Sequence, residues 1–235
     1  MPVPSQSESS GSVVRAALLI ASRVNGDPSA KPKAKPLFDS RAALKAQMRA
    51  RQDADDALII AAGLLDAAAA QTDRSLEAFS RKAIGELEGD DAPGDEDPQY
   101  LRIMKDATAR SLLPAGRADR TTEIKALAVR IKDKRTPANV RKAGDGLLAA
   151  IAGELAAVEA HKEADGELGT AGKAEAKAKE HTIITVRELA GTLNALFAKE
   201  PSRARRLLGQ QVPRKGKGKK KPAPAPASAP PVAAG

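Results

Sequence analysis

The residues with the clearest chemical capacity are nine cationic side chains near the C-terminal end of the chain. No acidic residue lies among them. They are Arg203, Arg205, Arg206, Arg214, Lys215, Lys217, Lys219, Lys220 and Lys221. A flexible run of cations neutralises nucleic-acid phosphates and releases counterions, which gives sequence-independent affinity that falls steeply with salt. The chain holds 39 basic and 30 acidic residues, so the first 200 positions are formally neutral and the excess charge belongs to this tail.

The tail continues beyond Lys221 as proline, alanine and serine. Over residues 213–235 its composition resembles the Lys-Pro-Ala-rich tails of linker histones and of similar bacterial DNA-associated proteins. That resemblance is compositional, so it implies contact with a polyanion and assigns no functional residue. Because the tail has no aromatic side chain, it offers no stacking platform for single strands or RNA. The other interpretation is that it solubilises the chain or binds any acidic surface, including the acidic residues at 90–97.

Catalytic and phosphate-binding motifs fail on inspection. The segment from Gly166 to Lys173 resembles a P-loop, but its first glycine is one residue too early and Ala174 replaces the hydroxyl that would meet magnesium. His161 and His181 lie twenty residues apart, with no second histidine at ligand spacing. No Gly-x-Ser-x-Gly elbow occurs and the chain has no cysteine. We therefore expect no nucleophile, no zinc site and no cofactor loop.

Paired carboxylates are abundant, but they lie among lysines and arginines. We interpret Asp55 with Asp56, and Glu154 with Glu159, as ordinary charged helix surface. The acidic run at 90–97 lacks the spacing of an EF-hand loop and is interrupted by Pro93. We expect a solvated loop there. The sequence thus predicts a protein that is not an enzyme, with no metal, no cofactor and no small-molecule substrate.

The chain as a whole is rich in alanine and poor in bulky side chains. There are 49 alanines, no tryptophan, one tyrosine and three phenylalanines among 235 residues. Apolar residues recur every three or four positions, which is helical spacing. We predict an all-α fold, with four to five helices forming a bundle or helical hairpins and with disordered termini.

Several boundaries can be placed from local signals. Positions 38–87 read as one helix. Asp97-Pro98 and Thr136-Pro137 each combine a capping side chain with proline at the first helical position, and Asp119 can cap the helix between them. We expect the helix from Pro137 to end near Gly166 or Gly169. We interpret 173–180 as helical and 182–186 as helix, with a short strand as the alternative.

The chain divides by composition into three parts. Residues 1–37 form a mobile N-terminal arm, with a short amphipathic or docking helix over 13–24 and a linker rich in proline and lysine. Residues 38–209 form the helical body, and 210–235 form the disordered tail. No apolar run approaches the length of a membrane span, the start of the chain lacks the basic residues of a signal peptide, and a cytoplasmic location is the default expectation.

Two functions fit these features. The first is a non-catalytic interaction or assembly protein with coiled-coil-like helices that pack against a protein partner or a second copy, with the basic tail touching a polyanion. A thin alanine-rich core leaves an isolated bundle marginally stable, so association would complete it. The alternative is a nucleoid-type DNA-binding protein that uses the cationic tail without sequence specificity.

Overall fold

Seven α-helices and one 3₁₀ helix make up the described part of the computed structural model, which covers residues 4–87, 97–104 and 117–210. No strand occurs in these ranges, so the expected all-α class is confirmed there. The tail residues 211–235 and the acidic run at 90–96 lie outside the described residues. The elements are α1 (Ser10–Asn25), η1 (Lys31–Lys33), α2 (Lys35–Leu87), α3 (Pro98–Met104), α5 (Arg117–Lys132), α6 (Ala138–Ala143), α7 (Asp145–Leu196) and α8 (Pro201–Leu207).

The contacts divide the chain into two units. Unit 1 contains residues 1–39 and 183–235, and unit 2 contains 40–182. The long helices α2 and α7 each contribute to both units. These boundaries cut across the three parts expected from composition, because two distant stretches of sequence meet in unit 1.

The core of unit 1 joins α1 to the start of α2, to the C-terminal part of α7 and to α8. Ser9 caps α1 by accepting a hydrogen bond from the Ser12 backbone N–H at 3.2 Å. The buried face of α1 packs with Leu37, with the last part of α7 and with α8. The expected helix over 13–24 is confirmed. The mobility of residues 1–37 stays a prediction, although the described part of this segment has a buried face.

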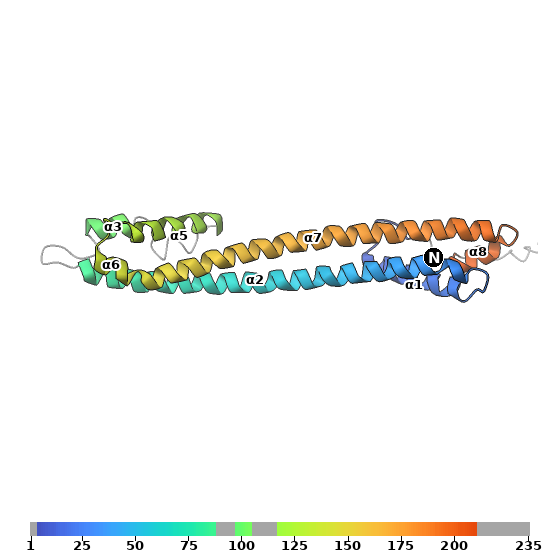
Figure 1. Cartoon of the computed structure of the whole chain (residues 1–235), viewed down its shortest axis with the longest axis horizontal. Coiled ribbons are helices and arrows are strands. Elements are labelled where there is room, and N and C mark those ends of the chain that lie inside the picture. The colour runs from blue at the N-terminus through green and yellow to red at the C-terminus, as the bar shows by residue number, and fades with distance from the viewer. Residues whose placement is uncertain (1–3, 88–96, 105–116, 211–235) are drawn as a thin grey trace, which may run out of the picture. The chain divides into compact units, whose positions relative to one another are not determined.

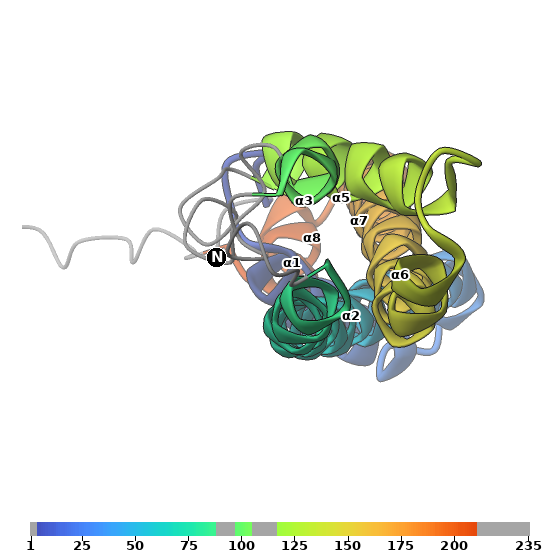
Figure 2. The same cartoon turned by 90° about the vertical axis from the view of Figure 1, so that its left-hand side faces the viewer.

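The core of unit 2 lies where five helices meet. It contains Leu76, Phe79 and Ala83 of α2, Ile103 and Met104 of α3, Ile124, Leu127 and Ile131 of α5, Val140 of α6, and Leu147 and Ile151 of α7. Within this unit, α2 and α7 run side by side (Figure 1). Viewed end-on, α2, α7 with α6, and α5 with α3 occupy three sides of this unit (Figure 2), and each contributes residues to the core. Small alanines between the bulky residues suit close helix packing.

One predicted helix end is wrong. Gly166, Gly169 and Gly172 all lie inside α7, which continues to Leu196. Each interior glycine costs only about 1 kcal/mol relative to alanine, and contacts with α2 on either side of the glycines oppose a break. Beyond them, Thr182 donates a hydrogen bond to the Ser40 carbonyl at 3.2 Å. Residues 173–180 and 182–186 are helical, so the strand alternative is also wrong.

Two predicted caps are wrong and one is confirmed. The Asp97 carboxylate accepts a hydrogen bond from the Gln99 backbone N–H at 2.6 Å, as expected for the start of α3. Thr136 does not cap α6. Its hydroxyl instead donates to the Arg130 carbonyl at 2.9 Å and satisfies the end of α5. Asp119 lies inside the first turn of α5, where its charge favours the helix dipole.

Candidate functional site

The predicted cationic site is only partly within the described residues. Arg203, Arg205 and Arg206 lie on α8, whereas Arg214, Lys215, Lys217, Lys219, Lys220 and Lys221 lie outside them. Helix α8 begins with proline at its first position and is followed by Gly209, whose φ of 72° is the left-handed conformation that favours glycine. The chain enters the undescribed tail directly after this helix.

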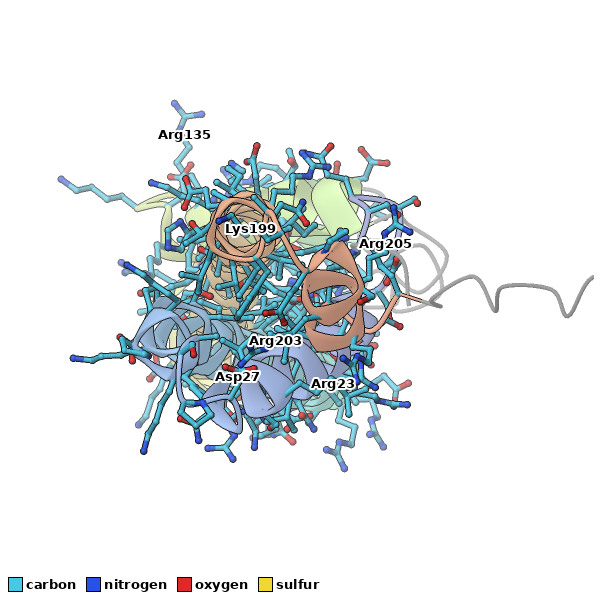
Figure 3. The ribbon with its side chains drawn as sticks, turned by 90° about the vertical axis from the view of Figure 1, so that its right-hand side faces the viewer. Arg23, Asp27, Arg135, Lys199, Arg203 and Arg205 are labelled. Carbon is cyan, nitrogen blue, oxygen red and sulfur yellow. The ribbon has the colours of Figure 1, made fainter. Side chains whose placement is uncertain are left out.

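Arg203 is engaged with another part of the chain. Its Nε donates to Asp27 Oδ2 at 2.9 Å and its Nη2 to Asp27 Oδ1 at 3.0 Å, a two-point pairing that favours arginine over lysine. The guanidinium carbon also lies 4.5 Å from the centroid of the Phe197 ring. Figure 3 shows Arg203 directed toward Asp27. This side chain therefore anchors α8 to the turn after α1.

The pairing shifts the pKa values of both groups. Loss of solvent acts to raise the pKa of Asp27, but hydrogen bonds from Arg203 and from the Ser29 and Ala30 backbone outweigh it and hold the pKa below its usual value. The hydrogen bond to Asp27 in turn raises the pKa of Arg203 despite some desolvation. Both groups are therefore charged at neutral pH. Their ion pair joins two residues that are 176 positions apart in the sequence.

Arg205 and Arg206 are exposed on α8. Arg206 and Arg23, from α1, help to line an open depression of about 900 Å³ within unit 1, with Asp27 and Arg203 beside them. Figure 3 labels Arg23 and Arg205 together with the Asp27–Arg203 pair. The depression holds three arginines and one carboxylate, so it is cationic, and Gln210, the last described residue of the chain, also lines it.

A buried ionic network occupies unit 2. Arg120 of α5 donates from Nε to Glu154 Oε1 at 2.6 Å and from Nη2 to Glu154 Oε2 at 3.1 Å. Its Nη2 also donates to Asp73 Oδ1 at 2.9 Å and to the Ala69 carbonyl at 3.0 Å. The hydrogen bond to Glu154 is the largest cause of the raised pKa of Arg120, which stays charged. One guanidinium thus ties α5 to both α2 and α7.

The expectation for Glu154 is corrected by this network. The residue is only 2% exposed, not part of a solvated surface. Sequence reasoning missed it because Glu154 and Arg120 are 34 positions apart. A signal was present, since Glu154 follows Leu147 and Ile151 on the apolar seam of α7. A cavity of about 300 Å³ borders the network, but these charges already pair with one another, which favours a structural role.

A surface stripe on α2 carries the bulkiest exposed apolar side chains on that helix. Ile59, Ile60 and Leu64 are 65%, 63% and 62% exposed. Gly63, Ala67 and Ala70 continue the same face and are also exposed. We call these six residues the α2 stripe. Single exposed leucines are ordinary, whereas adjoining large apolar residues on one face mark a contact surface.

The P-loop-like segment and both histidines lie on α7. The glycines of the P-loop-like segment lie within continuous helix, so they form no phosphate-binding loop. His161 is half-buried and His181 exposed, both on α7. In the part of the chain that the structure describes, no cluster of three or more histidine, aspartate or glutamate residues could hold a metal ion. None of the described helices is both long enough and apolar enough to cross a membrane.

Comparison with protein-family models, with curated proteins and with solved structures finds no match for this chain.

Proposed function

We propose that this chain is a non-catalytic helical interaction or assembly protein, which presents helix surfaces to a protein partner or to a second copy. The observation that supports this most is the α2 stripe, with Ile59, Ile60 and Leu64 each more than 60% exposed. Leaving such side chains in water is unfavourable by about 25 cal/mol per Å² of apolar surface, so covering them would stabilise the protein. In this proposal, four to five helices act as a bundle or hairpin that holds the stripe.

The test compares two variants of the full-length chain that each place a charge at an exposed apolar site. Ile60→Glu changes the α2 stripe, and Val129→Glu changes a site on α5 that is 70% exposed and outside the stripe. Association is measured by sedimentation velocity of the purified chain and by co-purification of bound protein. We expect Ile60→Glu to abolish association and Val129→Glu to leave it unchanged. A wild-type chain that neither self-associates nor retains a protein partner would contradict the proposal.

A second function is favoured by the charge of the C-terminal end. The nine cations from Arg203 to Lys221 contain no acid among them, and exposed Arg205 and Arg206 precede the tail on α8. We propose as the alternative that the tail binds DNA without sequence preference, in the manner of nucleoid proteins. The first proposal also includes a contact between the basic tail and a polyanion, and that contact has the same electrostatic origin.

DNA retardation tests the alternative directly. The full chain and a chain ending after Gly209 are compared on one duplex at about 50 and 200 mM salt. Several phosphate contacts lower affinity by about 10³-fold or more over such a range. Binding by the full chain that is lost in the shorter one supports the alternative. Equal binding by both, or none by either at low salt, excludes the tail.

A further inference from the structure

We propose that the α2 stripe is a homodimer contact, in which the α2 helices of two copies pack antiparallel about a two-fold axis level with position 65. This inference rests on the proposed function and names its partner as a second copy of the chain. All the residues that carry it lie in unit 2.

The order of residues along the stripe favours self-association. Asp56, Ile60, Gly63, Ala67, Ala70 and Arg74 follow one another at spacings of four and three, the pattern of a helix–helix seam. All three bulky side chains lie in the N-terminal half of the stripe, together with Gly63, and the C-terminal half holds only the small Ala67 and Ala70. Antiparallel pairing places Ile60 opposite Ala70 and Gly63 opposite Ala67. Parallel pairing would place Ile60 against Ile60.

The charges at the two ends of the stripe favour the same orientation. Asp56 stands before the apolar segment and Arg74 after it, and both are exposed on the face that carries the stripe. Antiparallel association about position 65 brings each Asp56 to the Arg74 of the other copy, which gives two pairs of opposite charge. Parallel association would oppose like charges at both ends, which is unfavourable.

Charges farther out limit the length of the contact. In the antiparallel arrangement Asp53 would face Glu77, and Arg49 would face Arg81, which are pairs of like charge. The helices must therefore cross at the stripe and diverge beyond Asp56 and Arg74. The apolar part, residues 59–70, spans about 18 Å of helix. One crossing of this length buries less than a standard interface, so we expect a Kd in roughly the micromolar range.

Charge exchange in the full-length chain tests the orientation. The variants are Asp56→Arg, Arg74→Asp and the double variant with both changes. Each single change opposes like charges twice per dimer, and we expect it to raise the dimer Kd about tenfold. The double variant restores opposite pairs, and its Kd should return to near the wild-type value. Sedimentation equilibrium from about 1 to 300 µM covers the expected range.

A matched control lies on the same helix. Arg81→Asp makes the same change as Arg74→Asp, two turns farther from the axis at an exposed position, and should leave the Kd within about twofold. Because all three sites are exposed, circular dichroism should show unchanged helix content in every variant.

Several results would overturn the inference. They are a monomeric wild-type chain across this concentration range, a dimer unaffected by both single changes, and single effects that the double variant does not reverse. A monomeric wild-type chain that still retains a different protein, and loses it on Ile60→Glu, would remove the homodimer while leaving the proposed function intact.

Discussion

The Arg120 guanidinium meets the Glu154 carboxylate through two hydrogen bonds, from Nε to Oε1 at 2.6 Å and from Nη2 to Oε2 at 3.1 Å. Glu154 is almost fully buried, so removing Arg120 would take these two hydrogen bonds from a carboxylate that water hardly reaches. Asp73, which accepts a further bond from Arg120, is only partly buried. The pair therefore locks α5 onto α7 at the price of keeping two charges out of water.

Removing one member of this pair should be more harmful than removing both. Arg120→Leu leaves the Glu154 carboxylate buried without its partner, and we expect a loss of about 3–5 kcal/mol in the free energy of unfolding. The double variant Arg120→Leu/Glu154→Leu leaves no carboxylate at position 154. Its loss should be smaller than that of Arg120→Leu, and well below the sum of the losses of Arg120→Leu and Glu154→Leu. Urea denaturation followed by circular dichroism measures all three.

An exposed ion pair provides the comparison. Lys162 and Glu159 are one turn apart on α7, with side chains 64% and 71% exposed. Lys162→Ala should change the free energy of unfolding by no more than about 0.5 kcal/mol. An Arg120→Leu variant as stable as Lys162→Ala would show that the Arg120–Glu154 pair contributes little to stability in solution.

Features determined by neighbouring residues could be predicted from the sequence, whereas contacts between residues far apart in it could not. Helix spacing and the Asp97-Pro98 start are local, and both were confirmed. The glycines of α7 were misleading, because the cost of a glycine is local whereas the contacts that hold α7 together come from α2, more than a hundred positions away. The pairs Arg120–Glu154 and Arg203–Asp27 were missed for the same reason. Charged side chains far apart in sequence carry no periodicity that would pair them.

The junction between α6 and α7 depends on the absence of a side chain at Gly144. A Cβ there would lie 2.7 Å from Ile131 Cγ2 and 3.4 Å from Phe79 Cε2, both core atoms of unit 2. Gly144→Ala should therefore destabilise the protein by about 1–3 kcal/mol through overpacking. Thermal unfolding measures the change. Gly153→Ala is the control, since nothing lies within 4 Å of its new Cβ, and a loss of stability in both variants would contradict this reasoning.

The glycines inside α7 should behave in the opposite way. A Cβ at Gly166, Gly169 or Gly172 meets no atom within 4 Å. Replacing each by alanine should stabilise the helix by up to about 1 kcal/mol. Native-state hydrogen exchange of the amides from 165 to 173 measures the local effect, with slower exchange expected in the triple alanine variant. Unchanged or faster exchange would mean that α7 bends or opens there and needs its glycines.

The pair between Asp27 and Arg203 should make unit 1 sensitive to acid. The pKa of Asp27 is lowered in the folded chain relative to its usual 3.8, so the folded state binds fewer protons than the unfolded state at low pH. Its contribution to stability is complete above the unfolded pKa and is lost as pH falls through the folded pKa. Asp27→Asn removes this dependence.

The measurement follows helix content from pH 6 to pH 2 and compares urea midpoints. Wild type should lose stability more steeply than Asp27→Asn below about pH 4. At neutral pH the variant should have the lower urea midpoint. Glu200→Gln removes the other carboxylate that pairs with Arg203. The Glu200 side chain is 61% exposed, so this variant should lose stability at low pH as steeply as wild type. Parallel curves for wild type and Asp27→Asn would show that the Arg203 pairing is absent in solution, and apolar contacts of Ala204, Leu207 and Leu208 would then hold α8 to unit 1.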